Sequence, residues 1–342
     1  MNIQQAIETL IDGGDLTQVD ARRIMGHILS GENTDAQIAA YLTALHIKGE
    51  TINEIAGSAM ALREKSLKVK AEGVVVDTSG TGGNDLGTFN ISTTAAFVVA
   101  GAGVKVAKHG NLSTLTKIGS ANLLKALGVN INAGISVVEQ CIREAGIGFL
   151  FSPLYHGAIK YAVGQHKDLA MSTLFNLLSP LTNPVENPYQ IIGVSDGIYT
   201  ECMASVLGRL GSKRSMVVHG MDGLDEITTT GKTRVAELLE DGNVTAYIIE
   251  PEQFGIPRTS LESLRSSEVT DNAKITRAVL AGDRGPHRDI VALNAGAALY
   301  ISGQTESIDS GLAMACEVID SGKAREKLDL LVSLSNATEL PR

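Results

Sequence analysis

A glycine-rich segment with several polar side chains offers the clearest chemistry in the sequence. It spans residues 77–93 and contains Gly80-Thr81-Gly82-Gly83-Asn84-Asp85. Glycines let the backbone approach a phosphate and direct its N–H groups at it. Asn90, Ser92 and Thr93 would add donors where a predicted helix starts near Ser92 and its dipole is positive. An ordinary glycine turn with a Ser or Thr N-cap is the alternative, but four glycines and three donors in one strand-loop-helix unit favour phosphate binding.

A lysine and an asparagine follow the next strand-like run. Lys108-His109-Gly110-Asn111 comes directly after residues 104–107, which are predicted to form a strand. A lysine at the carboxyl end of a strand points toward the crevice where open α/β sheets bind ligands. Lys108 would offset the charge of a bound pyrophosphate, and Asn111 would donate a hydrogen bond to an oxygen. A solvated turn is the alternative for this motif taken alone.

Two adjacent carboxylates follow a later strand-like run. Asp225 and Glu226, with Asp222 three residues earlier, come after residues 215–218. Mg²⁺ is commonly bound through one or two carboxylates together with substrate phosphates, so this pair suits a magnesium site. The alternative is a solvated acidic turn, and the phosphate loop elsewhere in the chain favours the metal. Mg²⁺ is therefore the expected cofactor.

Apolar spacing indicates which elements hold these segments. Residues 1–68 have apolar residues at helical spacing, with capping-box patterns that begin at Thr17 and Thr51. From about residue 70, β-branched runs alternate with helical segments, which predicts an α/β fold with a central, mostly parallel sheet. The predicted strands are Val74–Val76, Val104–Ala107, Ile147–Leu150, Ile191–Val194 and Ser215–Val218.

The segment of residues 227–250 has a mixed pattern. Two β-branched runs, Ile227–Thr230 and Ala246–Ile249, flank the segment Thr233–Leu239, which is predicted to be helical. From Asp271 onward the spacing of apolar residues again predicts helices. The α/β part is therefore expected to end in a group of helices.

Bulk composition excludes some classes of protein. The 342 residues are 44% hydrophobic without an apolar run long enough to span a bilayer, so a soluble protein with no membrane partner is expected. The net charge of −9 makes nucleic acid an unlikely partner. The first residues do not resemble a signal peptide, and the widely spaced Cys141, Cys202 and Cys316 suit a reducing cytosol. A cytoplasmic location is therefore expected.

A series of short motifs occurs in order along the chain, and together they resemble the anthranilate phosphoribosyltransferase family. They are Gly80–Gly83, Phe89–Thr93, Lys108–Asn111, Gly119–Ala121, His156, Phe175-Asn176, Pro180–Pro184, Asp225-Glu226, Gly285-Pro286 with Arg288-Asp289, and Leu293–Ala295. The resemblance runs the length of the chain. It implies transfer of the 5-phosphoribosyl group of phosphoribosyl pyrophosphate (PRPP) to the amine of anthranilate. The products would be N-(5-phosphoribosyl)anthranilate and pyrophosphate, in a step of tryptophan biosynthesis.

The resemblance also implies an architecture. In this family a small helical domain packs on a large α/β domain of the nucleoside phosphorylase and phosphoribosyltransferase type, with the substrates at the hinge. For this chain, it implies a helical domain of residues 1–70 with a contribution from about 167–187. The PRPP-binding α/β domain would then comprise residues 71–166 and 188–342. Dimers of the family form through the helical domain, so a homodimer is expected.

Carried over residue by residue, the resemblance assigns several sets of site residues. The residues expected to bind PRPP are Gly80, Thr81, Gly82, Gly83, Asn84, Asp85, Thr88, Asn90, Ile91, Ser92, Thr93, Lys108 and Ser120. The residues expected to bind the acceptor are Gly80, Asn111, His156, His166, Ser179 and Pro180. The metal ligands are expected to be Ser92, Asp225 and Glu226, and the catalytic residues Lys108, Asn111 and His156.

Most departures from the family pattern lie on the acceptor side. His166 stands where the family has the Arg that faces the anthranilate carboxylate, Ser172 replaces a second Arg, and Ser179 replaces a Gly. Elsewhere, Asn84 replaces the Asp that usually follows the glycine pair, and Leu112 replaces the Arg that usually follows the Lys108–Asn111 motif. An Arg offers a fixed fork to a carboxylate, whereas a His offers one donor and partial charge near neutral pH. Loss of one charge-assisted bond would cost on the order of 1.5–3 kcal/mol, roughly 10- to 150-fold in affinity.

The sequence therefore leaves three hypotheses. The first is phosphoribosyl transfer to anthranilate. The second is the same transfer to a different small aromatic amine; pyrimidine nucleoside phosphorylases share the fold, but Asn90–Thr93 and Asn176–Pro184 resemble the transferase. The third is a non-catalytic relative that binds nucleic acid, and both the net charge and the Asp225-Glu226 pair weigh against it.

Overall fold

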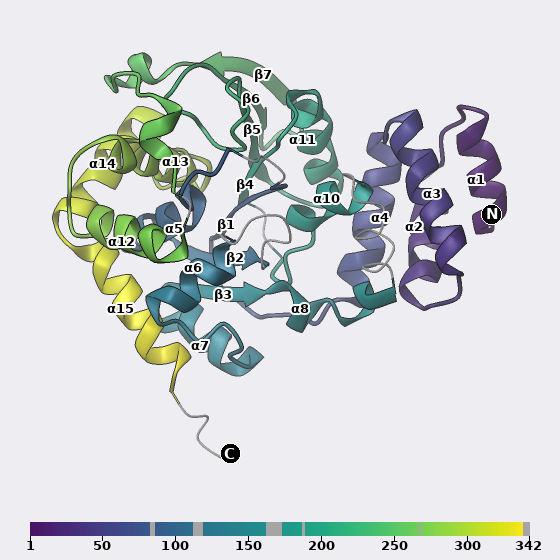
Figure 1. Cartoon of the computed structure of the whole chain (residues 1–342), viewed down its shortest axis with the longest axis horizontal. Helices are drawn as coiled ribbons and strands as arrows, with labels where there is room; N and C mark the ends of the chain where they lie inside the picture. The colour runs from purple at the N-terminus through teal and green to yellow at the C-terminus, as the bar shows by residue number, and fades with distance from the viewer. Residues whose placement is uncertain (83–85, 112–118, 162–172, 187–188, 267, 338–342) are drawn as a thin grey trace.

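The computed structural model describes residues 1–82, 86–111, 119–161, 173–186, 189–266 and 268–337. A bundle of N-terminal helices lies at one end of the molecule, beside a larger part in which helices surround a sheet (Figure 1). The bundle consists of α1 (Ile3–Ile11), α2 (Gln18–Leu29), α3 (Asp35–Lys48) and α4 (Ile52–Lys65). This arrangement confirms the expected combination of a small helical part with a large α/β part.

The helix starts expected at Thr17 and Thr51 are confirmed. The Thr17 hydroxyl accepts a hydrogen bond of 3.1 Å from the backbone N–H of Asp20 at the start of α2. At the start of α4, Thr51 and Glu54 cap each other, and the Thr51 N–H donates to Glu54 Oε2 at 2.8 Å. Since each cap satisfies backbone N–H groups that the helix itself leaves unpaired, these residues define where α2 and α4 begin.

The described strands form one seven-stranded sheet in the order β3-β2-β1-β4-β5-β6-β7. They are β1 (Val75–Gly80), β2 (Lys105–Gly110), β3 (Ile147–Phe151), β4 (Tyr189–Gly193), β5 (Arg214–Gly220), β6 (Thr233–Leu238) and β7 (Val244–Ile249). The strands from β3 to β5 are parallel, whereas β6 and β7 are antiparallel, which confirms the expected mostly parallel sheet. The strand order reverses between β1 and β4, and open α/β sheets bind ligands at such a reversal.

The expected helix in the segment after β5 is wrong. Thr233–Leu238 forms β6 rather than a helix, and Ile227–Thr230 belongs to no strand. The β6 segment is paired on both edges, with β5 on one side and β7 on the other. A pattern of seven residues does not distinguish a helix from a strand, and here the pairing on both edges decides between them.

Helices cover both faces of the sheet (Figure 1). The described α-helices after the bundle are α5 (Ile91–Gly101), α6 (Ser120–Leu127), α7 (Ile135–Glu144), α8 (Ser152–Tyr155), α10 (Leu174–Leu178), α11 (Thr200–Arg209), α12 (Val269–Leu280), α13 (Pro286–Ile301), α14 (Ile308–Asp320) and α15 (Lys323–Ser335), of which α10 packs on the bundle. Met216 and Val218 of β5 belong to one core with α5 and α13, whereas Val217 belongs to a second core with α11 and the N-terminal bundle. The core of the bundle is thus continuous with one face of the sheet. In the described parts of the chain, no helix is both long and apolar enough to cross a membrane.

The carboxyl ends of the central parallel strands share one feature. Each of β1, β2, β4 and β5 ends in a glycine, namely Gly80, Gly110, Gly193 and Gly220. Strands β1 and β2 extend further than the sequence indicated, so Lys108 lies within β2 rather than after it. Because parallel strands end at the same edge of a sheet, this edge gathers the polar segments identified in the sequence.

Candidate active site

The glycine-rich segment begins at the last residue of β1 and turns toward β4. The Thr81 N–H donates to the Gly193 carbonyl at 2.9 Å, and the Ser195 N–H donates to Thr81 Oγ1 at 3.2 Å. Gly82 has a φ of +63°, a conformation that favours glycine, and its N–H donates to Asp225 Oδ2 at 3.1 Å. The described part of the loop therefore lies directly against the predicted metal carboxylates.

Two glycines create the space for Asp225. A Cβ atom at Gly80 would lie 2.5 Å from Asp225 Oδ2, and one at Gly193 would lie 1.6 Å from the Asp225 carbonyl oxygen. Side chains at either position would displace the aspartate. The ends of β1 and β4 thus require glycine because the acidic turn packs on their backbones.

The N-terminus of α5 faces the same turn. Asn90 is the N-cap residue, and its backbone N–H donates to Asn272 Oδ1 of α12 at 2.8 Å. The Ser92 N–H donates to Glu226 Oε1 at 3.1 Å. A carboxylate is favourable at this end of a helix, where N–H groups are free and the dipole is positive. The N–H groups of Gly82 and Ser92, both predicted to bind phosphate, therefore contact the two carboxylates.

Glu226 has a perturbed titration. Burial and the neighbouring Asp225 carboxylate raise the pKa of Glu226 to about 8, against the opposing effects of Lys108 and of hydrogen bonds from Ser92. A carboxylate whose pKa is raised by burial and by a neighbouring carboxylate is stabilised in its ionised form by a cation, because opposite charge favours that form. The environment of Glu226 is therefore compatible with a bound cation.

The groups around Glu226 fit a magnesium ion. A cavity of about 10 Å³ is lined by Thr78, Ser79, Ser92, Ala95, Ile191, Glu226 and Asn294. Its polar lining is rich in oxygen atoms, which Mg²⁺ prefers as ligands. Across the described residues, no group of three or more His, Cys, Asp or Glu side chains is placed to hold a metal. Two carboxylates are the number typical of Mg²⁺ that is bound mainly through substrate phosphates, so the donor set agrees with the expectation.

Lys108 lies inside the molecule, next to these carboxylates. It is 4% exposed, and its Nζ donates to the Thr78 carbonyl. Burial lowers the pKa of the Lys108 ammonium, and the nearby carboxylates of Asp77, Glu226 and Asp225 oppose this shift. A buried ammonium requires such counter-charges. Lys108 thus places a positive charge between the glycine-rich loop and the acidic turn.

Asp77 of β1, for which the sequence indicated no role, links Lys108 and His109 of β2 to the segment that follows α10. This fully buried carboxylate accepts hydrogen bonds from the His109 N–H at 3.2 Å and from Asn183 Nδ2 at 2.8 Å. Asn183 Nδ2 also donates to the Ala107 carbonyl at 2.8 Å. Burial raises the pKa of Asp77, and the charge of Lys108 opposes the shift. Asp77 and Asn183 therefore fix strand β2 against the segment that follows α10.

Two buried histidines, His109 and His156, lie in contact with each other. The Nε2 atoms of His109 and His156 are 3.2 Å apart. Burial lowers the pKa of His156 to about 4, and burial, His156 and Lys108 lower the pKa of His109 well below its usual value. Hydrogen bonds to the backbones of Thr182 and Ser179 act in the opposite direction. His156, expected in the acceptor site, thus lies beside His109 and the segment that contains Ser179 and Pro180.

Other residues that were predicted to bind the substrates have a less direct relation to the groups described above. The side chains of Ile91 and Thr93 are each 1% exposed and lie in the core, so contact with a ligand would involve their backbone. Thr88 forms an isolated bridge with Arg265, and Ser120 is the first residue of α6, next to Gly110. Asn111 is exposed just after β2, and Ser179 and Pro180 begin a short 3₁₀ turn, Ser179–Leu181. The predicted site residues Gly83, Asn84, Asp85 and His166, and also Ser172 and Leu112, lie outside the described residues.

Asn272 and Asn294 are two further buried polar residues that contact the site without having been assigned a role. Each accepts a hydrogen bond from a backbone N–H of the site, Asn272 from Asn90 and Asn294 from Ile227. The position of Asn294 in an otherwise apolar helical stretch was a possible signal. The sequence did not reveal the partners of the two asparagines, which are 182 and 67 residues away in the sequence.

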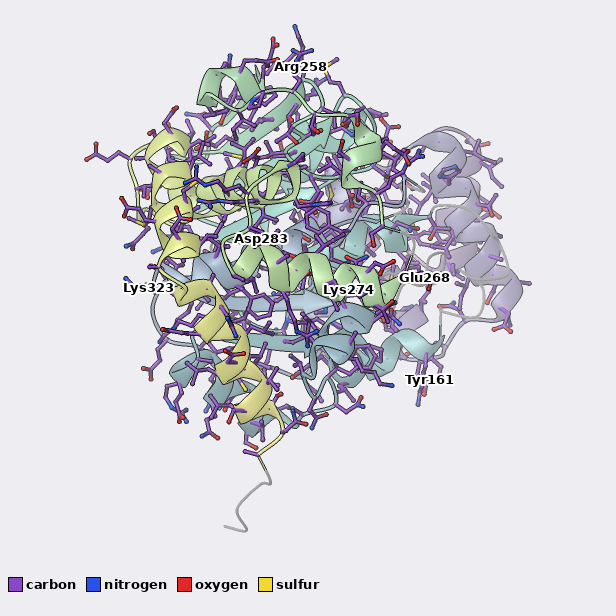
Figure 2. All side chains as sticks on the ribbon, turned by 60° about the vertical axis from the view of Figure 1, so that its left-hand side comes forward. Tyr161, Arg258, Glu268, Lys274, Asp283 and Lys323 are labelled. Carbon is purple, nitrogen blue, oxygen red and sulfur yellow. The ribbon has the colours of Figure 1, made fainter. Side chains whose placement is uncertain are left out.

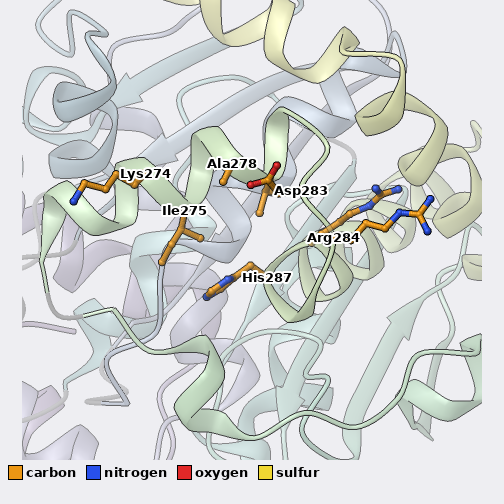
Figure 3. A pocket seen from close by; sticks show the side chains of 8 residues that line it. Lys274, Ile275, Ala278, Asp283, Arg284 and His287 are labelled. Atoms are coloured by element: carbon orange, nitrogen blue, oxygen red, sulfur yellow. The ribbon is translucent and has the colours of Figure 1, made fainter.

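A second cavity, of about 300 Å³, lies apart from the sheet edge, between α12 and α13 (Figure 3). Its lining includes Lys274, Asp283, Arg284 and His287. Figure 2 shows Lys274 and Lys323 on one face together with Glu268 and Asp283. This face therefore carries side chains of both signs of charge.

The comparison with known proteins agrees with this arrangement of two parts. The model described as "Glycosyl transferase family, helical bundle domain" matches residues 4–66, and "Glycosyl transferase family, a/b domain" matches residues 72–325. The bundle and the sheet edge are thus those of a glycosyl transferase. Anthranilate phosphoribosyltransferases from Moorella thermoacetica and Desulfosudis oleivorans are 48% and 49% identical to the chain, over 97% of it and 98% of each relative. The chain belongs to the anthranilate phosphoribosyltransferase family.

Solved structures give the same result. The anthranilate phosphoribosyltransferase from Thermus thermophilus superposes with a TM-score of 0.91 at 40% identity, covering 97% of this chain and 99% of that one. The Saccharomyces cerevisiae enzyme in complex with PRPP and Mg superposes with a TM-score of 0.89 at 27% identity, covering 97% of each chain. The same yeast enzyme in complex with 4-fluoroanthranilate gives a TM-score of 0.87 at 26% identity, again over 97% of each chain.

Proposed function

We propose that this protein transfers the 5-phosphoribosyl group of PRPP to the amine of anthranilate, releasing pyrophosphate, as in tryptophan biosynthesis. One observation carries the proposal: the Gly80–Gly82 loop, the N-terminus of α5, Lys108 and the Asp225-Glu226 pair meet at one edge of the sheet. N–H groups, a buried ammonium and paired carboxylates together match a ligand that brings both phosphate and a divalent cation. The relatives named above carry this activity in their names.

The donor half of the reaction depends on charge and position. As the amine attacks C1 of the ribose, pyrophosphate leaves through a dissociative, oxocarbenium-like transition state, so catalysis comes from positioning and electrostatic stabilisation. Lys108 offsets the charge that grows on the leaving pyrophosphate. N–H groups of the loop and of the α5 N-terminus hold its oxygens. Asp225, Glu226 and Ser92 would hold Mg²⁺, which when bound supplies further neutralisation of the pyrophosphate.

The acceptor half lies beside the two histidines. Asn111, His156, Ser179 and Pro180 would line the channel for the aromatic amine. An aromatic amine is a neutral nucleophile and needs no strong base before it attacks, but it must lose a proton afterwards. His156 is neutral near pH 7 because burial lowers its pKa to about 4, so either its ring or a water molecule can accept this proton.

The assembly and location belong to the same proposal. Ile11 of α1, Val19 of α2 and Ile47 of α3 are large apolar side chains with exposed fractions of 71%, 67% and 80%. Apolar side chains exposed on the helical bundle support a homodimer formed through it. We also propose the domain division at about residue 70, with residues 167–187 returning to the helical domain, and a cytoplasmic location. Leu174, which lies within residues 167–187, packs in the core of the bundle and supports this division.

The loss of anthranilate fluorescence upon incubation with PRPP and Mg²⁺ tests the reaction, with the product identified by mass. We expect N-(5-phosphoribosyl)anthranilate to form, and to be lost when Mg²⁺ is chelated. Absence of this product at millimolar anthranilate would refute the proposal. Substituted anilines and benzoates, assayed in parallel, test the identity of the acceptor. A clear preference for another aromatic amine would leave PRPP as the donor but would show that anthranilate is not the acceptor.

A further inference from the structure

We propose that Asn294 of α13 is a positioning residue that holds the Asp225-Glu226 turn in the conformation that binds the metal. The inference rests on the proposed function, because it takes these two carboxylates as the magnesium ligands. Asn294 itself would contact neither the metal nor the substrates. Its effect would pass through the backbone of Ile227, the residue directly after Glu226.

The side chain of Asn294 binds both backbone groups of Ile227, and we call this arrangement the clamp. Its Nδ2 donates to the Ile227 carbonyl at 2.8 Å, and its Oδ1 accepts from the Ile227 N–H at 3.0 Å. The second hydrogen of Nδ2 goes to the Ile290 carbonyl of the same helix at 2.9 Å. The side-chain amide thus binds both backbone groups of one residue, as a neighbouring strand would, and its own orientation is fixed by the helix.

The position of the clamp explains why it acts on Glu226. Asn294 is 4% exposed and lines the small cavity that Glu226 also lines. Because Ile227 follows Glu226 directly, fixing the φ and ψ angles of Ile227 limits where the Glu226 carboxylate can point. From the other side, Glu226 Oε1 is held by the Ser92 N–H. The carboxylate is therefore held from both sides before a metal arrives.

The other end of the turn has its own anchors. Asp222 accepts hydrogen bonds from the Leu224 N–H at 3.1 Å and from the Thr228 hydroxyl at 2.6 Å. The Gly220 N–H donates to the Leu224 carbonyl at 2.8 Å. These contacts close the loop on itself, whereas Asn294 ties it to helix α13. Without Asn294, the loop would keep its internal shape but lose this attachment to the α/β core beside Glu226.

Removing the clamp should weaken metal binding rather than only the fold. Residues that orient metal ligands from outside the coordination shell typically change metal affinity by about 10- to 100-fold when mutated. Asn294→Leu keeps the branched shape but neither donates nor accepts a hydrogen bond. The matched control is Ser335→Ala on α15, which removes a buried side chain that accepts from the Asn130 N–H at 3.0 Å, in a peripheral contact of the α/β part.

The experiment measures Mn²⁺ binding to the full-length protein in the presence of pyrophosphate, by the loss of the free Mn²⁺ signal in electron paramagnetic resonance. We expect the Kd for Mn²⁺ to rise about tenfold or more in Asn294→Leu and to stay within about twofold of the parent in Ser335→Ala. The Mg²⁺ concentration that gives half-maximal transfer should rise in parallel. A lower Tm in Asn294→Leu with an unchanged Kd would overturn the inference.

Glu226→Gln separates the two proposals. If Glu226→Gln weakens Mn²⁺ binding while Asn294→Leu does not, the positioning role is wrong and the metal site stands. If Glu226→Gln leaves Mn²⁺ binding unchanged, the metal assignment itself fails. Should the leucine variant not fold, Asn294→Ala is measured instead, together with amide hydrogen exchange of Ile227 in the parent. Rapid exchange of that N–H, which the clamp should protect, would also overturn the inference.

Discussion

Replacement of Gly193 by alanine is the substitution for which the structure makes the sharpest prediction. Its Cβ would lie 1.6 Å from the Asp225 carbonyl oxygen and 2.4 Å from the carbonyl carbon. Real Cβ atoms essentially never approach closer than 3.0 Å, so one of the two backbones must move by at least 1.4 Å. Strand β4 cannot yield easily, since Gly193 is paired with Gly80 on one side and Val218 on the other. The turn that carries Asp225 and Glu226 must therefore move.

Both stability and activity should respond to Gly193→Ala. Overpacking of this kind costs about 1–3 kcal/mol, and a misplacement of about 1 Å in a catalytic constellation can cost roughly 100-fold in rate. Thermal unfolding and kcat/KM for PRPP, compared with those of Gly231→Ala, provide the assay. A methyl group added at Gly231 would have no described atom within 4 Å, and this residue has no positive φ, so its replacement should be neutral. A Gly193→Ala protein with kcat/KM within about threefold of the parent would refute the reasoning.

Three further substitutions or conditions have expected outcomes. Arg63→Met removes the hydrogen bonds that Arg63 donates to the Leu181 carbonyl at 2.6 Å and to the Leu210 carbonyl at 3.1 Å. Urea unfolding should show a free energy of unfolding lower by about 1.5–3 kcal/mol, and an unchanged value would contradict a stabilising role of these bonds. Burial lowers the pKa of His156 from 6.5 to about 4. As the pH falls, the unfolded chain therefore takes up a proton on this residue before the folded protein does. The free energy of unfolding should thus fall by on the order of 3 kcal/mol between pH 7 and pH 4. Its dependence on pH should be weaker in His156→Gln, and an equal dependence in both proteins would contradict the lowered pKa of His156. Lys108→Met should lower kcat/KM for PRPP by about 100-fold or more, whereas an effect confined to the KM of anthranilate would contradict its role on pyrophosphate.

Much of the fold was predictable because its signals are local. The helices of the bundle follow from apolar spacing, and the caps at Thr17 and Thr51 mark where two of them begin. The parallel strands follow from β-branched runs alternating with helices. Strand β6 was not predictable, because its seven-residue pattern suits a helix equally well until β5 and β7 are placed beside it. Its conformation is a property of the sheet rather than of the segment.

The site divides in the same way. The glycine-rich loop, Lys108 and the Asp225-Glu226 pair are recognisable because each places its polar groups at the end of a predicted strand. The residues that hold them, although they lie in motifs of the family, were assigned no role because their partners are distant in the sequence: Asn183 contacts Asp77 across 106 residues, and Asn294 contacts Ile227 across 67. A buried asparagine in a helical pattern does not by itself indicate which backbone it binds.

A crystal structure of the protein with PRPP and Mg²⁺ would test most directly the claim that the carboxyl edge of β1, β2, β4 and β5 is the donor site. We predict that the pyrophosphate lies between Gly82, Lys108 and the N-terminus of α5, with a metal ion against Glu226. Ordered PRPP in the cavity between α12 and α13, with none at the sheet edge, would contradict the account.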